Sequence, residues 1–163
     1  MKALTVQNPS AMQIWGGRKT VEHRTWNTDY RGDILITSSS KKVRNCVCGY
    51  ALCVVRLADV VPFTKEHVIP AGYLPSNASA VMIDRYPFMD GYAWILEDVR
   101  PIKPFPIKGK LNLWNADIEE DKLEFMRRWP EDGATEAEED AWVKEYIEPL
   151  CHAPFPPLLP RNR

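Results

Sequence analysis

The sequence lacks several features that would place the protein in a specialised class. No apolar run approaches the roughly 20 residues of a transmembrane helix, and the N-terminal MKALTVQNPS has no signal-peptide hydrophobic core. Neither a glycine-rich phosphate-binding loop nor an internal repeat is visible. These absences argue against a membrane, secreted or P-loop protein, and we expect a cytoplasmic location.

Cysteine and histidine are sparse. The four cysteines have no C-x-x-C spacing, and three of them fall in one apolar, strand-like run where neighbours face opposite sides; they are Cys46, Cys48, Cys53 and Cys151. No two of the three histidines have the spacing of metal ligands. We therefore expect reduced thiols and neither a metal nor a cofactor.

The 163 residues suffice for one globular domain with an appendage, and the charges are divided unevenly along them. Residues 1–116 carry 15 Lys/Arg against 9 Asp/Glu, whereas residues 117–163 carry 6 against 13. This division predicts a basic domain over 1–116 and an acidic extension over 117–163. The extension is either a solvated appendage or a competitor of an anionic ligand.

Short strands with few hairpin signals predict a small, mostly antiparallel barrel of the α+β class, with one early helix. The helix is expected to begin with Asn8 as N-cap and Pro9 at its first position, and to end at Gly16–Gly17. Strands are expected over 2–6, 20–26, 33–37, 47–63 (bent), 91–96 and 99–106. Residues 64–67 suggest a short helix, and 74–90 a long loop with little regular structure.

The sequence of the extension predicts two peripheral helices, with Trp129 and Trp142 packed against the domain over 1–116. Apolar residues recur over 118–129, and Thr135 begins a capping-box motif that leads into a helix ending near Ile147. The end of the chain is rich in proline from Pro154 and predicts an extended tail.

Two separated segments resemble the ASCH domain, the module named after the activating signal cointegrator. The first is KALTVQNPSAMQIWGGRKTVEHRTWNTDYRGDILITSSSKK, with the hallmark Gly-x-Lys-Thr-hydrophobic-Glu-x-Arg-Ser/Thr-Trp at residues 17–26. The second is YAWILEDVRPIKPFPIKGKLNLWNAD, with the family's Pro-hydrophobic-Lys-Gly-Lys-x-x-x-Trp ending. The resemblance covers residues 2–116 and implies a PUA-like barrel, whose relatives bind RNA or modified bases. Ser10 stands where the family's helix usually carries Trp, so stacking at that position is not expected.

Lys19, Glu22 and Arg24 form the main candidate site for RNA, single-stranded nucleic acid or a modified nucleoside. Glu22 and Arg24 share one strand face, and Lys19 precedes the strand. The guanidinium suits phosphate or a base edge, and the carboxylate suits an exocyclic amine. Further candidate contacts are Trp26, Ser39, Lys41, Tyr92 and Lys108. Trp94 lies on the same strand face as Tyr92 and is either part of the core or an aromatic platform on which a base stacks.

Two other functions stay open. Some relatives are reported as amidohydrolases on acylated cytidine and others as ribonucleases, which would make Lys19, Thr20 and Glu22 candidate catalytic residues. The amidohydrolase motif, however, has Thr where this chain has Glu22, so Thr20 would have to take a different role. A protein-binding module is the third function, with the acidic extension as its contact surface for a protein partner.

Overall fold

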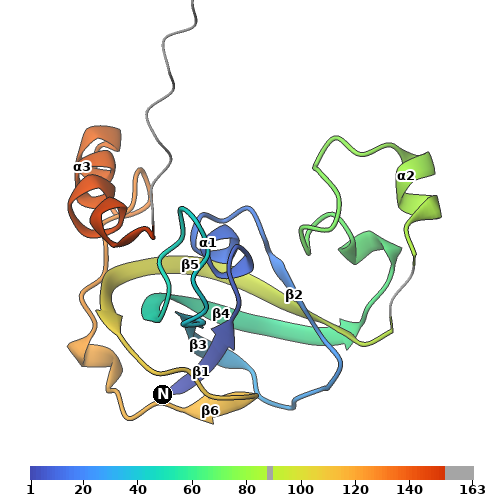
Figure 1. Ribbon diagram of the computed structural model, residues 1–163, viewed down its shortest axis with the longest axis horizontal. Helices are drawn as coiled ribbons and strands as arrows, with labels where there is room; N and C mark the ends of the chain where they lie inside the picture. The colour runs from blue at the N-terminus through green and yellow to red at the C-terminus, as the bar shows by residue number, and fades with distance from the viewer. Residues whose placement is uncertain (88–89, 153–163) are drawn as a thin grey trace, which may run out of the picture.

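The computed structural model describes residues 1–87 and 90–152, whose six strands form one curled, mixed sheet in the order β2-β5-β4-β3-β1-β6 (Figure 1). Their bounds are β1 (Lys2–Val6), β2 (Val21–Arg24), β3 (Gly32–Ser38), β4 (Tyr50–Pro62), β5 (Tyr92–Pro106) and β6 (Leu113–Asn115). Only β1 and β3 pair in parallel; the other four pairings are antiparallel. This half-barrel with a few helices confirms the predicted α+β, PUA-like fold.

The two long central strands bend so that the sheet can curl. Their pairing shifts register at three places, which accounts for the unusual length of the apolar run in β4. The prediction of two strands over 91–96 and 99–106 was wrong, because β5 continues through both. Asp98, at φ 50°, takes up the bend instead of ending the strand.

The early helix α1 (Ser10–Trp15) covers one face of the sheet, with Ala11 and Ile14 buried. The predicted cap is shifted by one residue, because the N-cap position is Pro9. Asn8 still serves the helix start: its side-chain oxygen accepts from the Met12 amide at 3.3 Å. The helix is followed by Gly17 at φ +75°, a conformation that favours glycine, as predicted.

The main core lies between the curled sheet and α1. Its fully buried side chains include Leu4, Ile34, Leu52 and Trp94, and each contributes roughly 1.5–3 kcal/mol through burial. Trp94 is therefore a core wall and not a platform. Ile147 of the extension also belongs to this core cluster.

Residues 64–87 form a lobe, hereafter the α2 lobe, that projects from the barrel between β4 and β5 (Figure 1). It contains the predicted short helix as η1 (Lys65–His67), capped by Thr64. It also contains α2 (Ala80–Arg85), where a loop was predicted. The Ser79 side chain caps α2 by accepting from the Met82 amide, a local signal within the polar Ser-Asn-Ala-Ser stretch.

The extension contains η2 (Glu120–Lys122), α3 (Glu136–Tyr146) and η3 (Glu148–Leu150). Helix α3 confirms the prediction from Thr135, whose hydroxyl and Glu138 form the capping box. The prediction of a helix over 118–129 is wrong, because this segment runs beside β5 and forms backbone hydrogen bonds with it. Lys103 donates to the Glu124 carbonyl at 2.8 Å, and Met126 donates to the Pro101 carbonyl at 2.9 Å.

The two tryptophans of the extension differ in environment. Trp142 packs against the main core as predicted, but Trp129 is about half exposed. The predicted tail from Pro154 lies outside the described residues.

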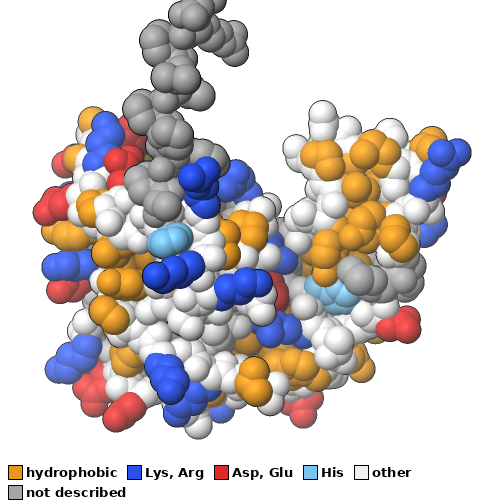
Figure 2. All heavy atoms as spheres, viewed as in Figure 1, with side chains coloured by type: hydrophobic (Ala, Val, Ile, Leu, Met, Phe, Trp, Pro, Cys, Tyr) orange, Lys and Arg blue, Asp and Glu red, His pale blue; other side chains and the backbone are white. Residues whose placement is uncertain are grey.

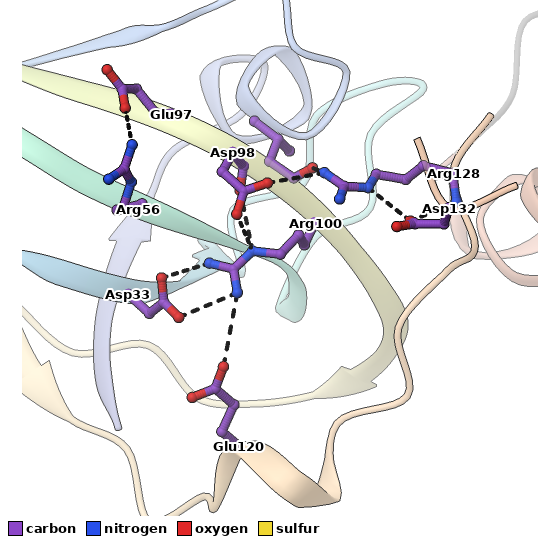
Figure 3. A network of polar contacts seen from close by, with 9 residues as sticks. Asp33, Arg56, Glu97, Asp98, Arg100, Glu120, Arg128 and Asp132 are labelled. Atoms are coloured by element: carbon purple, nitrogen blue, oxygen red, sulfur yellow. Dashed lines mark hydrogen bonds and ion pairs between the residues drawn. The ribbon is translucent and has the colours of Figure 1, made fainter. Parts of the chain in front are cut away.

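A charged network connects the extension to the barrel (Figure 3). Arg100 of β5 forms a bidentate pair with Asp33 and also contacts Asp98 and, at 3.8 Å, Glu120. Arg128 bridges Asp98 and Asp132 at 3.0 and 2.9 Å. Asp98 thus forms ion pairs with both arginines, Arg100 of the barrel and Arg128 of the extension.

The cysteines are free, and β4 contains only Cys53. Because the strand begins at Tyr50, Cys46 and Cys48 precede it, and the predicted alternation does not apply to them. Burial raises the pKa of the Cys53 thiol far above its ordinary value. Among residues 1–87 and 90–152, no helix is long and apolar enough to cross a membrane, and no three potential ligand residues are grouped to hold a metal.

Candidate functional site

A cavity of about 610 Å³ opens where the two ends of the curled sheet approach each other. Strands β1 and β3 run parallel, so their carboxyl ends lie side by side and the residues that follow both strands meet there. Strand β2 and the loop over 108–112 supply the remaining walls. The lining residues are Thr5, Val6, Gln7, Ser10, Glu22, His23, Arg24, Ser39, Ser40, Lys108, Gly109, Lys110, Leu111 and Asn112.

The cavity wall contains a buried charged triad, Lys19–Glu22–Arg24. The Glu22 carboxylate lies 3.2 Å from Lys19 Nζ through Oε2 and 3.2 Å from Arg24 Nε through Oε1. The side chains of Lys19 and Glu22 are only 6% and 10% exposed, whereas Arg24 is 23% exposed and faces the cavity. Thr20 lies beside this triad but is exposed and is not among the lining residues.

The triad's contacts are close but poorly directed for hydrogen bonding. Lys19 donates to the Ala71 carbonyl at 2.9 Å, and Arg24 Nη2 donates to the Thr5 carbonyl at 3.0 Å. By contrast, the buried Glu22 Oε2 and Arg24 Nε have no hydrogen-bond partner within the described chain. Both atoms nevertheless lie 3.2 Å from an opposite charge, and the two cations leave the triad with one positive charge in excess beside the cavity.

Thr5 holds the 108–112 loop against β1. Its hydroxyl contacts the Thr37 hydroxyl at 3.0 Å and accepts from the Lys110 amide at 3.2 Å and the Trp114 indole at 3.3 Å. Gly109 lies so close that a Cβ there would be 2.5 Å from Thr5 Cγ2. This close approach requires glycine for packing, and it sets the positions of Lys108 and Lys110.

The charged residues that line the cavity are mostly basic. Arg24, Lys108 and Lys110 outnumber the single carboxylate of Glu22. The Ser39 hydroxyl accepts from the Lys41 amide at 3.3 Å at the β3 exit. Such a combination of cations and hydroxyls around one carboxylate can bind a phosphate and a polar base edge together.

The structure brings four of the sequence-predicted residues to the cavity lining: Glu22, Arg24, Ser39 and Lys108. Lys19 lies directly behind Glu22, and the exposed Lys41 lies beyond Ser39. Ser39 reaches the cavity from the end of β3, although β3 does not pair with β2.

The sequence-predicted aromatics lie outside the cavity lining. Trp26 packs edge-on against Trp94 at 4.7 Å and lines a neighbouring hollow that shares Asn112 with the cavity. Tyr92 is half-buried against the main core.

A different aromatic group adjoins the site from the α2 lobe. Tyr73 lies with its hydroxyl 2.8 Å from His23 Nδ1, and Lys19 Nζ lies 6.0 Å from its ring centroid. The pKa of Tyr73 is raised, first by burial and then by Tyr86 and the negative charge of Glu22. The lobe and the end of α1 enclose a second hollow of about 340 Å³, and Arg18 and Lys19 are among its lining residues.

Sequence reasoning missed Thr5, Asn112 and Tyr73. The Lys-Gly-Lys spacing had indicated Lys110 together with Lys108, because it places both lysines in the turn of Gly109, as a clamp for backbone phosphate or as a solvated turn. Thr5 and Tyr73 gave no local signal, since their roles depend on contacts with residues about 105 and 50 positions away.

The fold and the cavity define a class: a small half-barrel with a basic cleft at its seam. Within that class, the sequence matches the ASCH domain family over residues 4–105, and the chain belongs to this family, which is generally associated with RNA binding. No curated protein sequence matches the chain.

Similar solved structures include the ASCH protein of Zymomonas mobilis, at 16% identity and a TM-score of 0.45, covering 94% of this chain and 97% of that one. A tyrosine-to-phenylalanine variant of that protein has 19% identity and a TM-score of 0.45, with 64% and 74% of the two chains covered. A serine-to-alanine variant has the same identity and TM-score, with 65% and 73% covered.

Proposed function

We propose that the protein binds RNA or a modified nucleotide in the cavity at the barrel seam. The observation that carries the proposal is the buried Glu22 carboxylate held between two cations beside a lining rich in Lys and Arg. Lys108 and Lys110 contact backbone phosphate, and Arg24 contacts phosphate or a base edge. Glu22 accepts a hydrogen bond from an exocyclic amine of a splayed base.

The test measures the binding of a fluorescently labelled six-nucleotide single-stranded RNA by anisotropy, at several salt concentrations. The double variant Lys108→Ala/Lys110→Ala removes two exposed cations of the lining. Both the affinity and the slope of log K against log salt should fall, the slope by roughly 0.7 for each phosphate that the variant no longer neutralises. Lys19 is a poor first target, because removing a buried cation would disturb folding.

Lys144→Ala is the matched control, because it removes an exposed cation from α3, away from the cavity. It should leave affinity and salt slope unchanged. Equal effects of the cavity and control variants, or no binding by the wild-type chain, would refute the proposal.

Chromatography of the same mixtures tests the alternative of a hydrolase. Because Thr20 is exposed and is not among the residues lining the cavity, we expect the RNA to be recovered intact. Recovery of cleaved or deacylated ligand would instead favour an enzyme.

A further inference from the structure

The α2 lobe presents a row of aromatic rings that begins at the cavity. His23, which lines the cavity, stacks on Phe63 with ring centroids 4.0 Å apart and an interplanar angle of 19°. Tyr73 meets the His23 ring edge-on at 5.7 Å, and Tyr86 stacks on Tyr73 at 5.6 Å and 26°. The row thus connects β2 with α2.

The base of the lobe is fixed to the site by hydrogen bonds. The Pro70 carbonyl accepts from the backbone amides of Thr20 and Val21, and the next residue along, Ala71, accepts from Lys19 Nζ. His23 Nε2 donates to the Asp90 carbonyl at 2.8 Å, and His23 Nδ1 lies 2.8 Å from Tyr73 Oη. A platform held in this way keeps its position relative to the cavity, as base stacking requires.

The row and its neighbours on α2 form a partly accessible, apolar surface. Tyr73 is 36% exposed, Tyr86 is half-buried, and Val81 and Met82 of α2 are about half exposed. In Figure 2, hydrophobic side chains gather on the lobe, and a hollow separates its upper part from the body. Because His23 lines the cavity and the Tyr73 ring lies 5.7 Å from the His23 ring, the lobe adjoins the cavity.

The charges of the lobe indicate what kind of ligand contact it makes. Residues 64–87 carry two cations and two carboxylates, so the lobe gives no net attraction for phosphate. The cations that attract phosphate line the cavity instead. A ligand that is anionic at the cavity and flat and aromatic at the lobe is a nucleic acid whose bases are unpaired.

We propose that the α2 lobe is a stacking wall of the same site, and that it binds a base of a single-stranded nucleic acid next to the nucleotide in the cavity. This inference rests on the proposed function and deepens it. The ligand is a strand of at least two nucleotides, one in the cavity and the next against the Tyr73–Tyr86 pair. Duplex is disfavoured, because its bases stay stacked on one another.

The test uses Tyr86→Leu in the full-length chain, which removes the outer ring and keeps an apolar side chain. Tyr86→Phe keeps the ring and should bind as the wild type does. The affinity for the six-nucleotide RNA should fall about tenfold, toward the low end of what base–aromatic stacking contributes, whereas binding of cytidine monophosphate should not change. The salt slope should also stay constant, in contrast to the slope of the Lys108→Ala/Lys110→Ala variant.

Two further measurements complete the design. Phe125→Leu is the control, because it removes an aromatic ring of the extension that is 40% exposed and should leave binding unchanged. An RNA that contains 2-aminopurine reports stacking directly, and its fluorescence should be quenched by the wild-type protein but not by Tyr86→Leu.

The outcomes separate this inference from the proposed function. Unchanged affinity and retained quenching in Tyr86→Leu, with a loss of affinity in the lysine variant, would overturn the stacking wall alone and leave Val81 and Met82 for a protein partner. A lower salt slope in Tyr86→Leu would overturn it as well. Absence of RNA binding by the wild-type chain would overturn both.

Discussion

The charged triad allows the effect of burial on the strength of an ion pair to be measured separately from the effect of the N···O distance, because the protein also has an exposed pair of similar distance. Glu22→Gln keeps the shape of the side chain but removes the charge that neutralises Lys19 and Arg24. Asp59→Asn makes the same chemical change in the Arg31–Asp59 pair, whose N···O distance of 3.1 Å nearly equals the 3.2 Å of the triad. Arg31 and Asp59, however, are 38% and 57% exposed.

The expected losses of stability differ because water solvates only the exposed pair. Removing one partner of a buried pair typically costs 3–5 kcal/mol, because it leaves an uncompensated charge. Lys19 and Arg24 each keep one backbone acceptor, so we expect about 3 kcal/mol for Glu22→Gln, at the low end of that range. For Asp59→Asn we expect less than about 1 kcal/mol, since the pair is screened and the amide oxygen can still accept from the Val60 amide.

Urea unfolding followed by circular dichroism measures the difference. With an m value of about 2 kcal/mol per molar urea, Glu22→Gln should lower the midpoint by about 1.5 M and Asp59→Asn by less than about 0.5 M. The double variant Lys19→Met/Glu22→Gln should recover part of the loss, because the amide then no longer faces a buried ammonium. Equal losses in the two single variants would refute the assignment of the triad as a buried, coupled group.

Three other predictions concern the rim, the extension and the α2 lobe. Gly109→Ala should displace the loop from Thr5 and weaken RNA binding severalfold while the thermal midpoint changes little; unchanged binding would contradict the close packing. Hydrogen bonds from Arg128 and Thr135 lower the pKa values of Asp132 and Glu138, so both stabilise the folded extension above the ordinary carboxyl pKa. That stabilisation should be lost as pH falls through the lowered values, seen as faster proteolysis of the extension below about pH 4 but not at pH 7. Tyr73 should ionise above the ordinary tyrosine range and stabilise the fold at lower pH, with the effect lost as pH rises through its raised pKa; ultraviolet titration of Tyr73→Phe should lack this step.

Elements whose stability comes from local patterns could be predicted from the sequence. The first strand has the predicted bounds, and the helix after Thr135 begins at its capping box. The segment over 118–129 failed because its apolar residues serve a long-range pairing with β5 rather than a helix face. Hydrophobic periodicity and intrinsic propensity depend on residues that are close in the sequence. They therefore do not reveal a pairing with a strand about 20 residues away.

The candidate site also contains some features that local patterns predict and others that depend on long-range contacts. Glu22 and Arg24 share a strand face, so alternation alone predicts that they face one ligand. That Trp94 is buried and that Tyr73 lies beside Lys19 depends on how the sheet curls and where the α2 lobe returns. The sequence therefore indicated the charges of the candidate site, but the aromatic residues that it proposed pack in or against the core.

The location of the site also follows from the way the sheet is assembled. The sheet's two edge strands in the described chain, β2 and β6, do not pair with each other, so the curled sheet has a seam rather than a closed ring of backbone hydrogen bonds. Arg24 crosses that seam by donating to the Thr5 carbonyl of β1. The Glu22 carboxylate neutralises the guanidinium there, and Lys19 holds the other carboxylate oxygen of Glu22. A guanidinium has more N–H donors than the Thr5 carbonyl and Glu22 use, and Arg24 is 23% exposed and lines the cavity. The side chain that bridges the seam is therefore also the one that, under the proposed function, contacts an anionic ligand, and this would couple the stability of the barrel to occupancy of the cavity.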